Sequence, residues 1–270
     1  MLELADRVAV VTGSSTGVGR AIALELAAAG AHVVVHCRSR VEAAEQVANS
    51  IRELGRLSTV IVADLADGTT HERLVDQAWS WRDGVDIWIN NAGADVLTGS
   101  ARHASFDEKL DLLWRVDVLG TIRLSRLVGP RMKARASRAG ESSLITIGWD
   151  QVEHGMEGDS GEMFTAIKGA VMSFTKSLAR TLAPQIRVNC LALGWIRTAW
   201  GEQASDYWRK RALSEALLQR WGTPEDVARA ARFLVSPAAS FITGQILPIN
   251  GGFKIRGELN SELDNERNNS

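Results

Sequence analysis

Three glycines near the N-terminus, Gly13, Gly17 and Gly19, have the spacing of a turn that binds an anion. An apolar run over residues 8–11 precedes them and an apolar-periodic segment follows as far as Gly30, so we expect a buried strand, a glycine turn and a helix. In such a turn Gly13 permits the sharp bend, Gly17 lets the backbone approach a diphosphate, and Gly19 lets the helix pack closely on the strand. The free N–H groups and the positive end of the helix would face the ligand. The pattern predicts either a phosphate-binding loop or a merely structural turn.

The elements that must position this loop alternate between strand and helix along most of the chain. The expected strands are mostly continuous apolar runs, as is typical of parallel strands that are covered on both faces. Alternation of this kind predicts an α/β protein with right-handed crossovers, in which seven parallel strands form a doubly wound sheet with helices on both faces. The expected strands are 8–11, 31–37, 57–64, 85–90, 143–148, 186–193 and 245–250.

Short polar motifs mark where helices should begin. Three segments have the form of a capping box, in which a hydroxyl and a carboxylate three residues later satisfy the first backbone N–H groups; they are Ser39-x-x-Glu42, Thr69-x-x-Glu72 and Ser105-x-x-Glu108. Thr223 followed by Pro224 is a helix start with proline in the first turn. Two long helices are expected, over 105–133 and 162–182.

Composition and charge exclude several classes of protein. The chain has 270 residues, of which 45% are hydrophobic and 23% charged, and its net charge of −1 implies neither a nucleic-acid partner nor an anionic membrane. No apolar run is long enough to span a bilayer, and no leader segment precedes the first strand. Cys37 and Cys190 fall in expected buried strands, which favours thiols in a reducing, cytoplasmic compartment over a disulfide or a metal pair.

Several further motifs complete a family pattern. They are Thr12-Gly13-x-x-x-Gly17-x-Gly19, Asp64-Leu65, Asn90-Asn91-Ala92-Gly93, Lys168-Gly169-Ala170, Arg187-Val188-Asn189, Gly194-x-x-x-Thr198, Thr243-Gly244-Gln245 and Asn250-Gly251-Gly252. With them the chain resembles the short-chain dehydrogenases/reductases over about residues 5–253. The resemblance implies one Rossmann-like domain over 1–253, followed by a polar tail, 254–270, that we expect to be disordered.

The resemblance also implies a nicotinamide dinucleotide and the residues that hold it. Asp64 and Leu65 would border the adenine, although Asp64 is equally suited to capping the end of its strand. Lys168 would hold the nicotinamide ribose. The remaining residues of the implied cofactor site are Gly13, Ser15, Thr16, Gly17, Val18 and Gly19 in the glycine turn, Asn91, Ala92 and Gly93 beneath the cofactor, and Gly194, Ile196 and Thr198 at the nicotinamide end.

The end of the second strand bears on which nicotinamide cofactor is bound. A carboxylate there hydrogen-bonds the ribose 2′-hydroxyl of NAD, whereas a basic residue accommodates the 2′-phosphate of NADP. Here the segment 36–40 contains no acid, and Arg38 with Ser39 could hold a phosphate by charge-assisted hydrogen bonds. We therefore predict NADP(H), the alternative being that Arg38 is a solvated surface charge and Ser39 only a helix cap.

The family's catalytic set is largely replaced. Active members share an asparagine, a serine and a Tyr-x-x-x-Lys pair. The asparagine orders a water relay, the serine polarises the carbonyl, and the tyrosine supplies a proton. The corresponding residues here are Asp117, Trp149 (or Gly148), Phe164 and Lys168, so only the lysine survives. A positioned acid contributes roughly 10²–10⁴-fold, and an oxyanion donor on the order of 10²–10³-fold. Ordinary ketone reduction should therefore be crippled.

Three interpretations remain open. The first is a redox enzyme that reduces an imine or iminium, which needs no acid; Trp149, Phe164 and lid tryptophans would supply an aromatic wall, and Asp150 or Asp117 a compensating charge. For a carbonyl substrate, Asp150 or His154 could act as a substitute acid. The second is a non-redox catalyst, and the third a pseudoenzyme that binds nucleotide and a partner. Asp150 could instead cap a loop, Asp117 could simply pair with Lys168, and His154 could be an exposed loop residue.

Residues 195–221 form an insertion that the resemblance assigns to a lid over the substrate. It contains Trp195, Trp200 and Trp208, which predict an aromatic or apolar small-molecule substrate, or else simple packing of the lid. Trp221, at its end, is expected in the core or an interface. The resemblance also implies a homotetramer built on the two long helices and the last strand.

Overall fold

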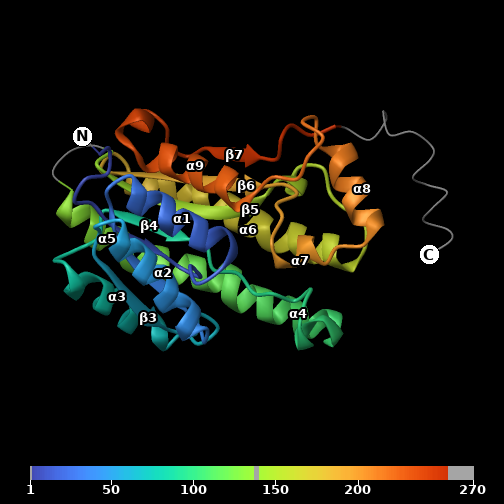
Figure 1. The fold of residues 1–270 in the computed structure, drawn as a ribbon, viewed down its shortest axis with the longest axis horizontal. Helices are drawn as coiled ribbons and strands as arrows, with labels where there is room; N and C mark the ends of the chain where they lie inside the picture. The colour runs from blue at the N-terminus through green and yellow to red at the C-terminus, as the bar shows by residue number, and fades with distance from the viewer. Residues whose placement is uncertain (1, 137–139, 255–270) are drawn as a thin grey trace.

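The computed structural model describes residues 2–136 and 140–254. Its strands form one parallel sheet in the order β3-β2-β1-β4-β5-β6-β7 (Figure 1), which confirms the predicted doubly wound architecture. The strands are β1 (Val8–Val11), β2 (His32–Cys37), β3 (Ser58–Val62), β4 (Ile87–Asn90), β5 (Ser142–Trp149), β6 (Ile186–Leu193) and β7 (Ile246–Ile249). Each lies within about two residues of its expected position, because continuous apolar runs are what a sheet buried on both faces requires.

Helices cover both faces of the sheet. The helices are α1 (Gly17–Ala28), α2 (Val41–Glu53), α3 (Thr70–Trp81), α4 (Phe106–Leu113), α5 (Thr121–Arg135), α6 (Asp159–Leu182), α7 (Ala199–Glu202), α8 (Asp206–Glu215) and α9 (Pro224–Val235). One core layer packs α1, α2 and α9 against the sheet, and a second packs α3, α5 and α6 against the opposite face. Neighbouring strand residues alternate between the two layers, as the period of a strand dictates: Val11 lies in the first and Val10 in the second.

The strand order reverses between β1 and β4. In a doubly wound sheet the loops that follow the two strands at such a switch point diverge, and they leave a crevice at the carboxyl ends of the strands where ligands bind. Here the loop after β1 contains the glycine turn and the loop after β4 begins at Asn91. The topology therefore brings two of the predicted cofactor segments to one edge.

Thr69 and Ser105 are the N-caps of the helices that they were predicted to begin, but only Ser105 forms the reciprocal box, and the box predicted at Ser39 is wrong. The box at Ser105 forms, with the Ser105 N–H donating to Glu108 Oε2 at 2.8 Å. At Thr69 the hydroxyl instead donates to Asp67 Oδ1 at 2.7 Å, because a turn competes for the same side chain. Helix α2 takes Arg40 as its N-cap, so Ser39 lies one position outside the helix. Thr223 does begin α9, with Pro224 at the first helical position.

The long helix expected over 105–133 is interrupted. Between α4 and α5 the chain forms a π-helical segment, Trp114–Gly120, that the sequence did not predict. A π-helical turn adds a residue per turn and so rotates the following side chains, and it frequently marks functional sites. This segment contains Asp117, one of the predicted catalytic residues.

Two classes of feature are absent from the part of the chain that the structure describes. No helix there is long and apolar enough to cross a bilayer. Within the same ranges no group of three or more metal-ligating side chains comes together. Except for Lys254, the tail predicted for 254–270 lies outside the described residues.

Candidate active site

The three glycines of the turn have different structural reasons, which match the predicted ones. Gly13 has φ of +64°, and a Cβ there would lie 2.8 Å from the Cα of Ala92. A Cβ on Gly19 would lie 2.4 Å from Asn91 Nδ2 and from the Gly13 carbonyl oxygen, so α1 packs directly on the turn. Gly17 has φ of +57°, yet a Cβ there would meet no atom within 4 Å. Gly17 therefore faces open space at the N-terminus of α1, where an anion would be bound.

The loops after β1 and β4 are joined by hydrogen bonds across the switch point. Thr12 Oγ1 accepts from the backbone N–H groups of Asn91 and Ala92, both at 3.0 Å. The Asn91 side chain in turn donates to the Thr12 carbonyl oxygen at 2.8 Å. The structure thus brings Asn91 and Ala92 against the glycine turn, while Gly93 beside them is exposed.

The residues at the expected adenosine end lie where the sequence predicted. Arg38 and Ser39 are exposed directly after the buried Cys37, at the carboxyl end of β2. Asp64 follows β3, and its Oδ1 accepts from the Ala66 N–H at 2.9 Å, so it does cap the strand end. Leu65 is buried beside it. A surface with a guanidinium and a hydroxyl and without a carboxylate at the β2 end suits a phosphate.

Lys168 is engaged in an ion pair. Its ammonium donates to Asp117 Oδ2 at 2.8 Å, and Asp117 Oδ1 accepts from the Ala94 N–H, also at 2.8 Å. Only 2% of the Asp117 side chain and 14% of the Lys168 side chain are exposed. The pair links α6, the π-helical segment and the loop after β4, and it confirms the predicted contact between the two residues. Its net charge is zero.

Beside this pair lie two aromatic rings, at the positions where the family resemblance implies hydroxyl groups. Trp149 ends β5 and Phe164 lies on α6, one helical turn before Lys168. Their ring centroids are 6.1 Å apart at an interplanar angle of 66°, an edge-to-face contact. Neither ring can give up a proton as tyrosine does, so the wall that they form is apolar.

Asp150 directly follows Trp149 at the end of β5, and its side chain contacts Asn250, which follows β7. Its side chain is buried, Oδ2 accepts from Asn250 Nδ2 at 3.1 Å, and Oδ1 has no hydrogen-bond partner among the described residues. Burial raises the pKa of Asp150 to about 6, and the nearby Glu215 carboxylate adds to the rise. The close packing also explains Gly194, since a Cβ there would lie 2.5 Å from the Cβ of Asn250 and 3.0 Å from Asp150 Oδ2.

The other predicted substitute acid, His154, is exposed and stacks on Phe253 with ring centroids 4.6 Å apart. This arrangement fits the alternative in which His154 is a surface residue. Ile196 is buried and packs in the core under α9, while Thr198 is the half-buried N-cap of α7. Ser15 is buried at the turn, and Thr16 and Val18 flank Gly17 at the start of α1.

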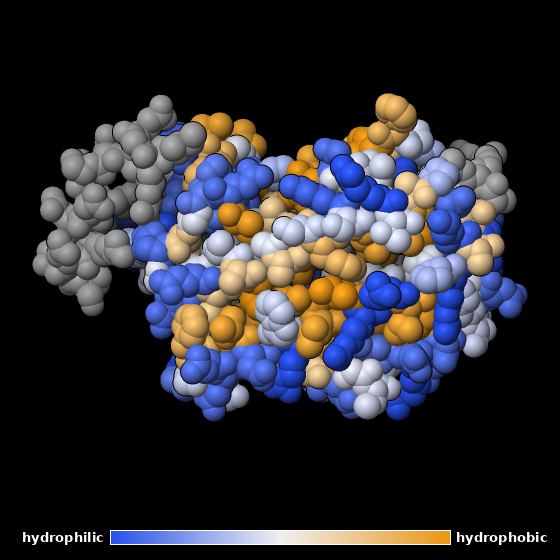
Figure 2. Space-filling model, turned by 180° about the vertical axis from the view of Figure 1, so that it is seen from behind, coloured by the Kyte–Doolittle hydropathy of each residue, from blue (hydrophilic) through white to orange (hydrophobic). Residues whose placement is uncertain are grey.

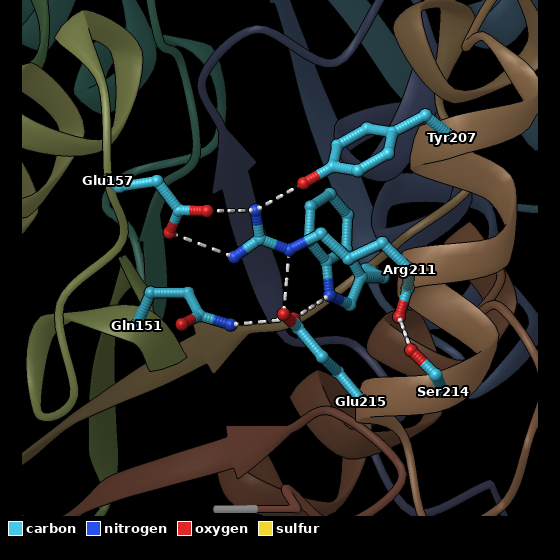
Figure 3. A network of polar contacts seen from close by, with 7 residues as sticks. Gln151, Glu157, Tyr207, Arg211, Ser214 and Glu215 are labelled. Carbon is cyan, nitrogen blue, oxygen red and sulfur yellow. Dashed lines mark hydrogen bonds and ion pairs between the residues drawn. The ribbon is translucent and has the colours of Figure 1, made fainter. Parts of the chain in front are cut away.

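Sequence reasoning missed the network that fixes the lid. Arg211 on α8 is buried and donates to Glu215 Oε1 at 2.7 Å and to Glu157 Oε1 at 2.9 Å (Figure 3). Glu215 Oε2 accepts from Trp195 Nε1 at 2.8 Å and from Gln151 at 3.4 Å. Burial opposes the charge of Arg211, but the hydrogen bonds that Arg211 donates to the two carboxylates outweigh it and raise the Arg211 pKa above its usual range. The i,i+4 spacing of Arg211 and Glu215 was the available signal.

Four tryptophans of the lid region pack on one another. Trp195 lies 5.8 Å from both Trp208 and Trp221, and 6.2 Å from Trp200, measured between ring centroids. Trp221, expected in the core or an interface, is therefore part of this cluster. The aromatic residues predicted to form one wall divide into two groups: the pair Trp149 and Phe164, and the tryptophans Trp195, Trp200 and Trp208, which Trp221 joins in the lid cluster.

Comparison with known proteins identifies the family. A family model described as enoyl-(acyl carrier protein) reductase matches residues 13–254. Cyclohexanol dehydrogenase of Rhodococcus sp. (strain TK6) is 36% identical over 269 residues, which cover 93% of this chain and 97% of that protein. The chain belongs to the short-chain dehydrogenase/reductase family.

Two solved structures show the same fold with different cofactors. A short-chain dehydrogenase from Burkholderia cenocepacia J2315 in complex with NADP has a TM-score of 0.81 and 31% identity, covering 93% of this chain and 98% of that one. A 7α-hydroxysteroid dehydrogenase complexed with NADH and 7-oxo glycochenodeoxycholic acid has a TM-score of 0.83 and 30% identity, covering 93% and 96%. Both similarities extend over nearly the whole of each chain.

Proposed function

We propose that this chain is an NADP(H)-dependent oxidoreductase whose site favours a C=N⁺ substrate, an iminium or protonated imine, over a ketone. The observation that carries the proposal is the edge-to-face contact of Phe164 with Trp149, one helical turn from Lys168. The contact supports the proposal because it forms an apolar wall from the two residues that the resemblance aligns with the hydroxyl groups of a ketone reductase. The proposal therefore concerns substrate class as well as cofactor.

The cofactor assignment is supported by residues of this chain. Of the similar structures, two hold NADP or NADPH and one holds NADH, so the fold alone does not choose between them. The absence of a carboxylate at the end of β2, with Arg38 and Ser39 exposed there, favours the 2′-phosphate of NADP(H). The open space at Gly17 fits a diphosphate on the N-terminus of α1. When bound, the nicotinamide would supply or accept a hydride.

The charges of the protein's own residues favour a cationic substrate. Hydride addition to an iminium carbon moves the C=N π pair onto nitrogen and yields a neutral amine, so no proton donor is required. A lone Lys168 ammonium would repel such a cation. Asp117, paired with Lys168 at 2.8 Å, cancels that charge, and the rings of Trp149 and Phe164 offer π-faces that attract cations.

The test compares matched substrates. Cyclic iminium ions should be reduced with consumption of NADPH, while ketones of the same ring size should react at least about a hundredfold more slowly, since a positioned acid contributes roughly 10²–10⁴-fold. The double variant Phe164→Tyr with Trp149→Ser restores the family's hydroxyl groups and should gain ketone reduction. Binding of NADPH without reduction of any imine, or equal rates on imines and ketones, would overturn the proposal.

One observation favours a second candidate. The Lys168 ammonium, which the resemblance assigns to binding the nicotinamide ribose, is already paired with Asp117. In addition, the ion pairs of Arg211 hold the lid in place. Both features suit a pseudoenzyme that binds nucleotide and a partner without turnover. Tight NADPH binding together with inertness towards both substrate classes is the outcome expected of that protein, whereas a non-redox catalyst would act with the cofactor left unchanged.

We also propose that the protein is a cytoplasmic homo-oligomer. Figure 2, which shows the face opposite that of Figure 1, has apolar residues gathered across its middle. On the helical run of α4, the π-helical segment and α5, Phe106 and Trp114 are 36% and 45% exposed, which is unusual for such large apolar side chains. Cys37 and Cys190 are buried as free thiols, which fits a reducing compartment.

A further inference from the structure

One buried histidine, His36, links the two sides of the predicted nucleotide site. It lies near the carboxyl end of β2 and is 2% exposed. Its Nδ1 accepts from the backbone N–H of Gly13 at 2.9 Å, and its Nε2 lies 3.1 Å from the Ala63 carbonyl oxygen. Gly13 begins the glycine turn and Ala63 directly precedes Asp64, so a single imidazole ring spans from the diphosphate side to the adenine side.

The backbone of His36 completes the connection. The Ser14 N–H donates to the His36 carbonyl oxygen at 2.9 Å, and the His36 N–H donates to Ser14 Oγ at 3.1 Å. Ser14 Oγ itself donates to the Val11 carbonyl oxygen at 2.7 Å. The first half of the turn, Gly13 and Ser14, is therefore bound to β2. Its N–H groups and the Ser14 hydroxyl are occupied, which leaves the exposed Thr16 and Gly17 to face a ligand.

The hydrogen bonds fix the form of the ring. Because Gly13 N–H is a donor, Nδ1 must be unprotonated, and because the Ala63 oxygen is an acceptor, Nε2 must carry the proton. His36 is thus the neutral Nε2–H tautomer. Burial favours this form and lowers the pKa of His36 to about 4, so the ring stays neutral at physiological pH although the Asp64 carboxylate lies nearby.

We propose that His36 is a positioning residue for the nucleotide: it holds the Gly13 amide, and with it the glycine turn, in the conformation that leaves Gly17 open to the diphosphate. This inference rests on the proposed nucleotide-binding function of the turn. Gly13 has φ of +64°, a conformation that a flexible turn leaves readily, and the imidazole removes that freedom before the ligand arrives. A preorganised turn binds more tightly because less ordering remains to be done on binding.

Two variants, His36→Asn and His36→Gln, separate the two hydrogen bonds that the imidazole makes. Asn offers an oxygen near the Nδ1 position and so keeps an acceptor for Gly13, whereas Gln reaches towards the Nε2 position and keeps a donor for Ala63. We expect His36→Gln to raise the Kd for NADPH about tenfold, as the loss of one buried hydrogen bond in the turn implies. His36→Asn should raise it less than about threefold. Equal Kd values for the two variants and the wild type would overturn the proposal.

The same strand provides a matched control. His32, at the other end of β2, is also buried, and its Nδ1 accepts from the Leu57 N–H at 2.9 Å, far along the strand from the glycine turn. His32→Gln removes a bond of the same kind and should reduce resistance to urea while leaving the Kd for NADPH unchanged. If His32→Gln weakens NADPH binding as much as His36→Gln, His36 acts only through overall stability and the proposal fails.

A measurement without nucleotide separates this inference from the proposed function. Amide hydrogen exchange should show the Gly13 N–H protected in the wild type and in His36→Asn, and exchanging at least about tenfold faster in His36→Gln. Unprotected Gly13 in the wild type would overturn the inference. If Gly13 is protected as expected but the wild type does not bind NADPH, the nucleotide-binding function fails while the structural role of His36 stands.

Discussion

At the scale of single residues, Asp117 decides what Lys168 can do. Its carboxylate is almost fully buried and has two partners, the Lys168 ammonium and the Ala94 N–H. An asparagine at this position would keep the backbone hydrogen bond but leave the ammonium uncompensated. The acid therefore converts a cationic pocket into a neutral one, which matters if the substrate is itself a cation.

Asp117→Asn tests this electrostatic argument. Because two unit charges about 5 Å apart interact by roughly 3 kcal/mol at an effective dielectric constant of about 20, reduction of an iminium should fall by at least about tenfold. Reduction of a neutral ketone should not fall with it. The measurement is kcat/KM for both substrates, with urea unfolding of each protein to show that it is folded. Parallel changes for the two substrates would count against a role for the Asp117 charge.

Asp150 predicts an unusual dependence of stability on pH. Its pKa is raised from 3.8 to about 6 by burial, so the folded protein binds this proton more tightly than the unfolded chain. The resulting stabilisation is complete below pH 3.8 and is lost as pH rises through 6, amounting to roughly 2–3 kcal/mol. Asp150→Asn lacks this pH-dependent contribution to stability, and its amide oxygen can still accept a hydrogen bond from Asn250. We expect the variant to be more stable than the wild type at pH 7.5.

The measurement is the free energy of unfolding in urea at pH 4, 5.5 and 7.5, compared as the value for Asp150→Asn minus the value for the wild type. The difference removes other titrations, such as that of His36, whose lowered pKa acts in the opposite direction between about 4 and 6.5. A difference that does not grow with pH would show that Asp150 titrates normally.

The candidate site was predictable only in part from sequence. The glycine turn, Lys168 and its ion pair with Asp117 could be predicted because motif spacing and helix position locate them. The bonds of His36 to Gly13 and Ala63 join segments 23 and 27 residues apart, and those of Arg211 to Glu157 span 54 residues. Such contacts depend on how strands register and how a lid folds back, which local patterns do not encode.

At the scale of elements, helix starts show how tertiary context overrides a local motif. Ser105 and Glu108 form the expected reciprocal cap on α4, whereas Ser39 makes no cap on α2. Both sites have the same motif and both serines are exposed. The difference is where the helix actually begins, a boundary that sequence patterns locate only to within a few residues.

This contrast gives a stability prediction. Ser105→Ala should lower the free energy of unfolding by about 1 kcal/mol, the typical value of an N-cap side chain. Ser39→Ala, measured without nucleotide, should change it by less than about 0.5 kcal/mol, as for a surface substitution. Urea unfolding of the two variants against the wild type is the measurement, and equal losses would mean that Ser39 caps α2 after all.

The lid gives a second prediction at this scale. Arg211→Met leaves Glu215 buried without its main partner, so we expect a loss of about 3 kcal/mol or more in unfolding free energy and a looser α8. Limited trypsin digestion should then cleave after Lys210, a site that both variants retain, faster than in the wild type. Arg209→Met is the control, since Arg209 on the same helix is exposed and pairs with Asp206 only at 3.8 Å. Equal digestion of both variants would show that the network does not hold the lid.

At the scale of the whole molecule, the fold itself was the part best predicted. All seven strands were located, because both faces of the sheet are buried and each strand is therefore a continuous apolar run. The π-helical segment was missed, since a single added residue in a turn leaves the apolar pattern of a long helix almost intact. The proposed assembly rests on the family resemblance and on exposed apolar residues, and it is tested separately.

Self-association should depend on the face formed by α4, the π-helical segment and α5. Trp114→Glu places a charge on this face and should lower the molar mass measured by light scattering towards that of the monomer. Leu54→Glu is the control, because Leu54 is similarly exposed, at 47% against 45%, but follows α2 in the opposite layer. A wild-type protein that is monomeric at every concentration would refute the assembly, and dissociation by Leu54→Glu alone would place it on the other face.

The cluster of lid tryptophans has an optical consequence. Indole rings whose centroids lie 5.8–6.3 Å apart couple electronically, so Trp195, Trp200, Trp208 and Trp221 should share one excitation and give a split signal in circular dichroism. A movement of α8 away from the segment after β6 would break the bond of Trp195 to Glu215 and would separate the Trp208 ring from the Trp195 ring. The split signal would therefore report such a movement of α8 without any label.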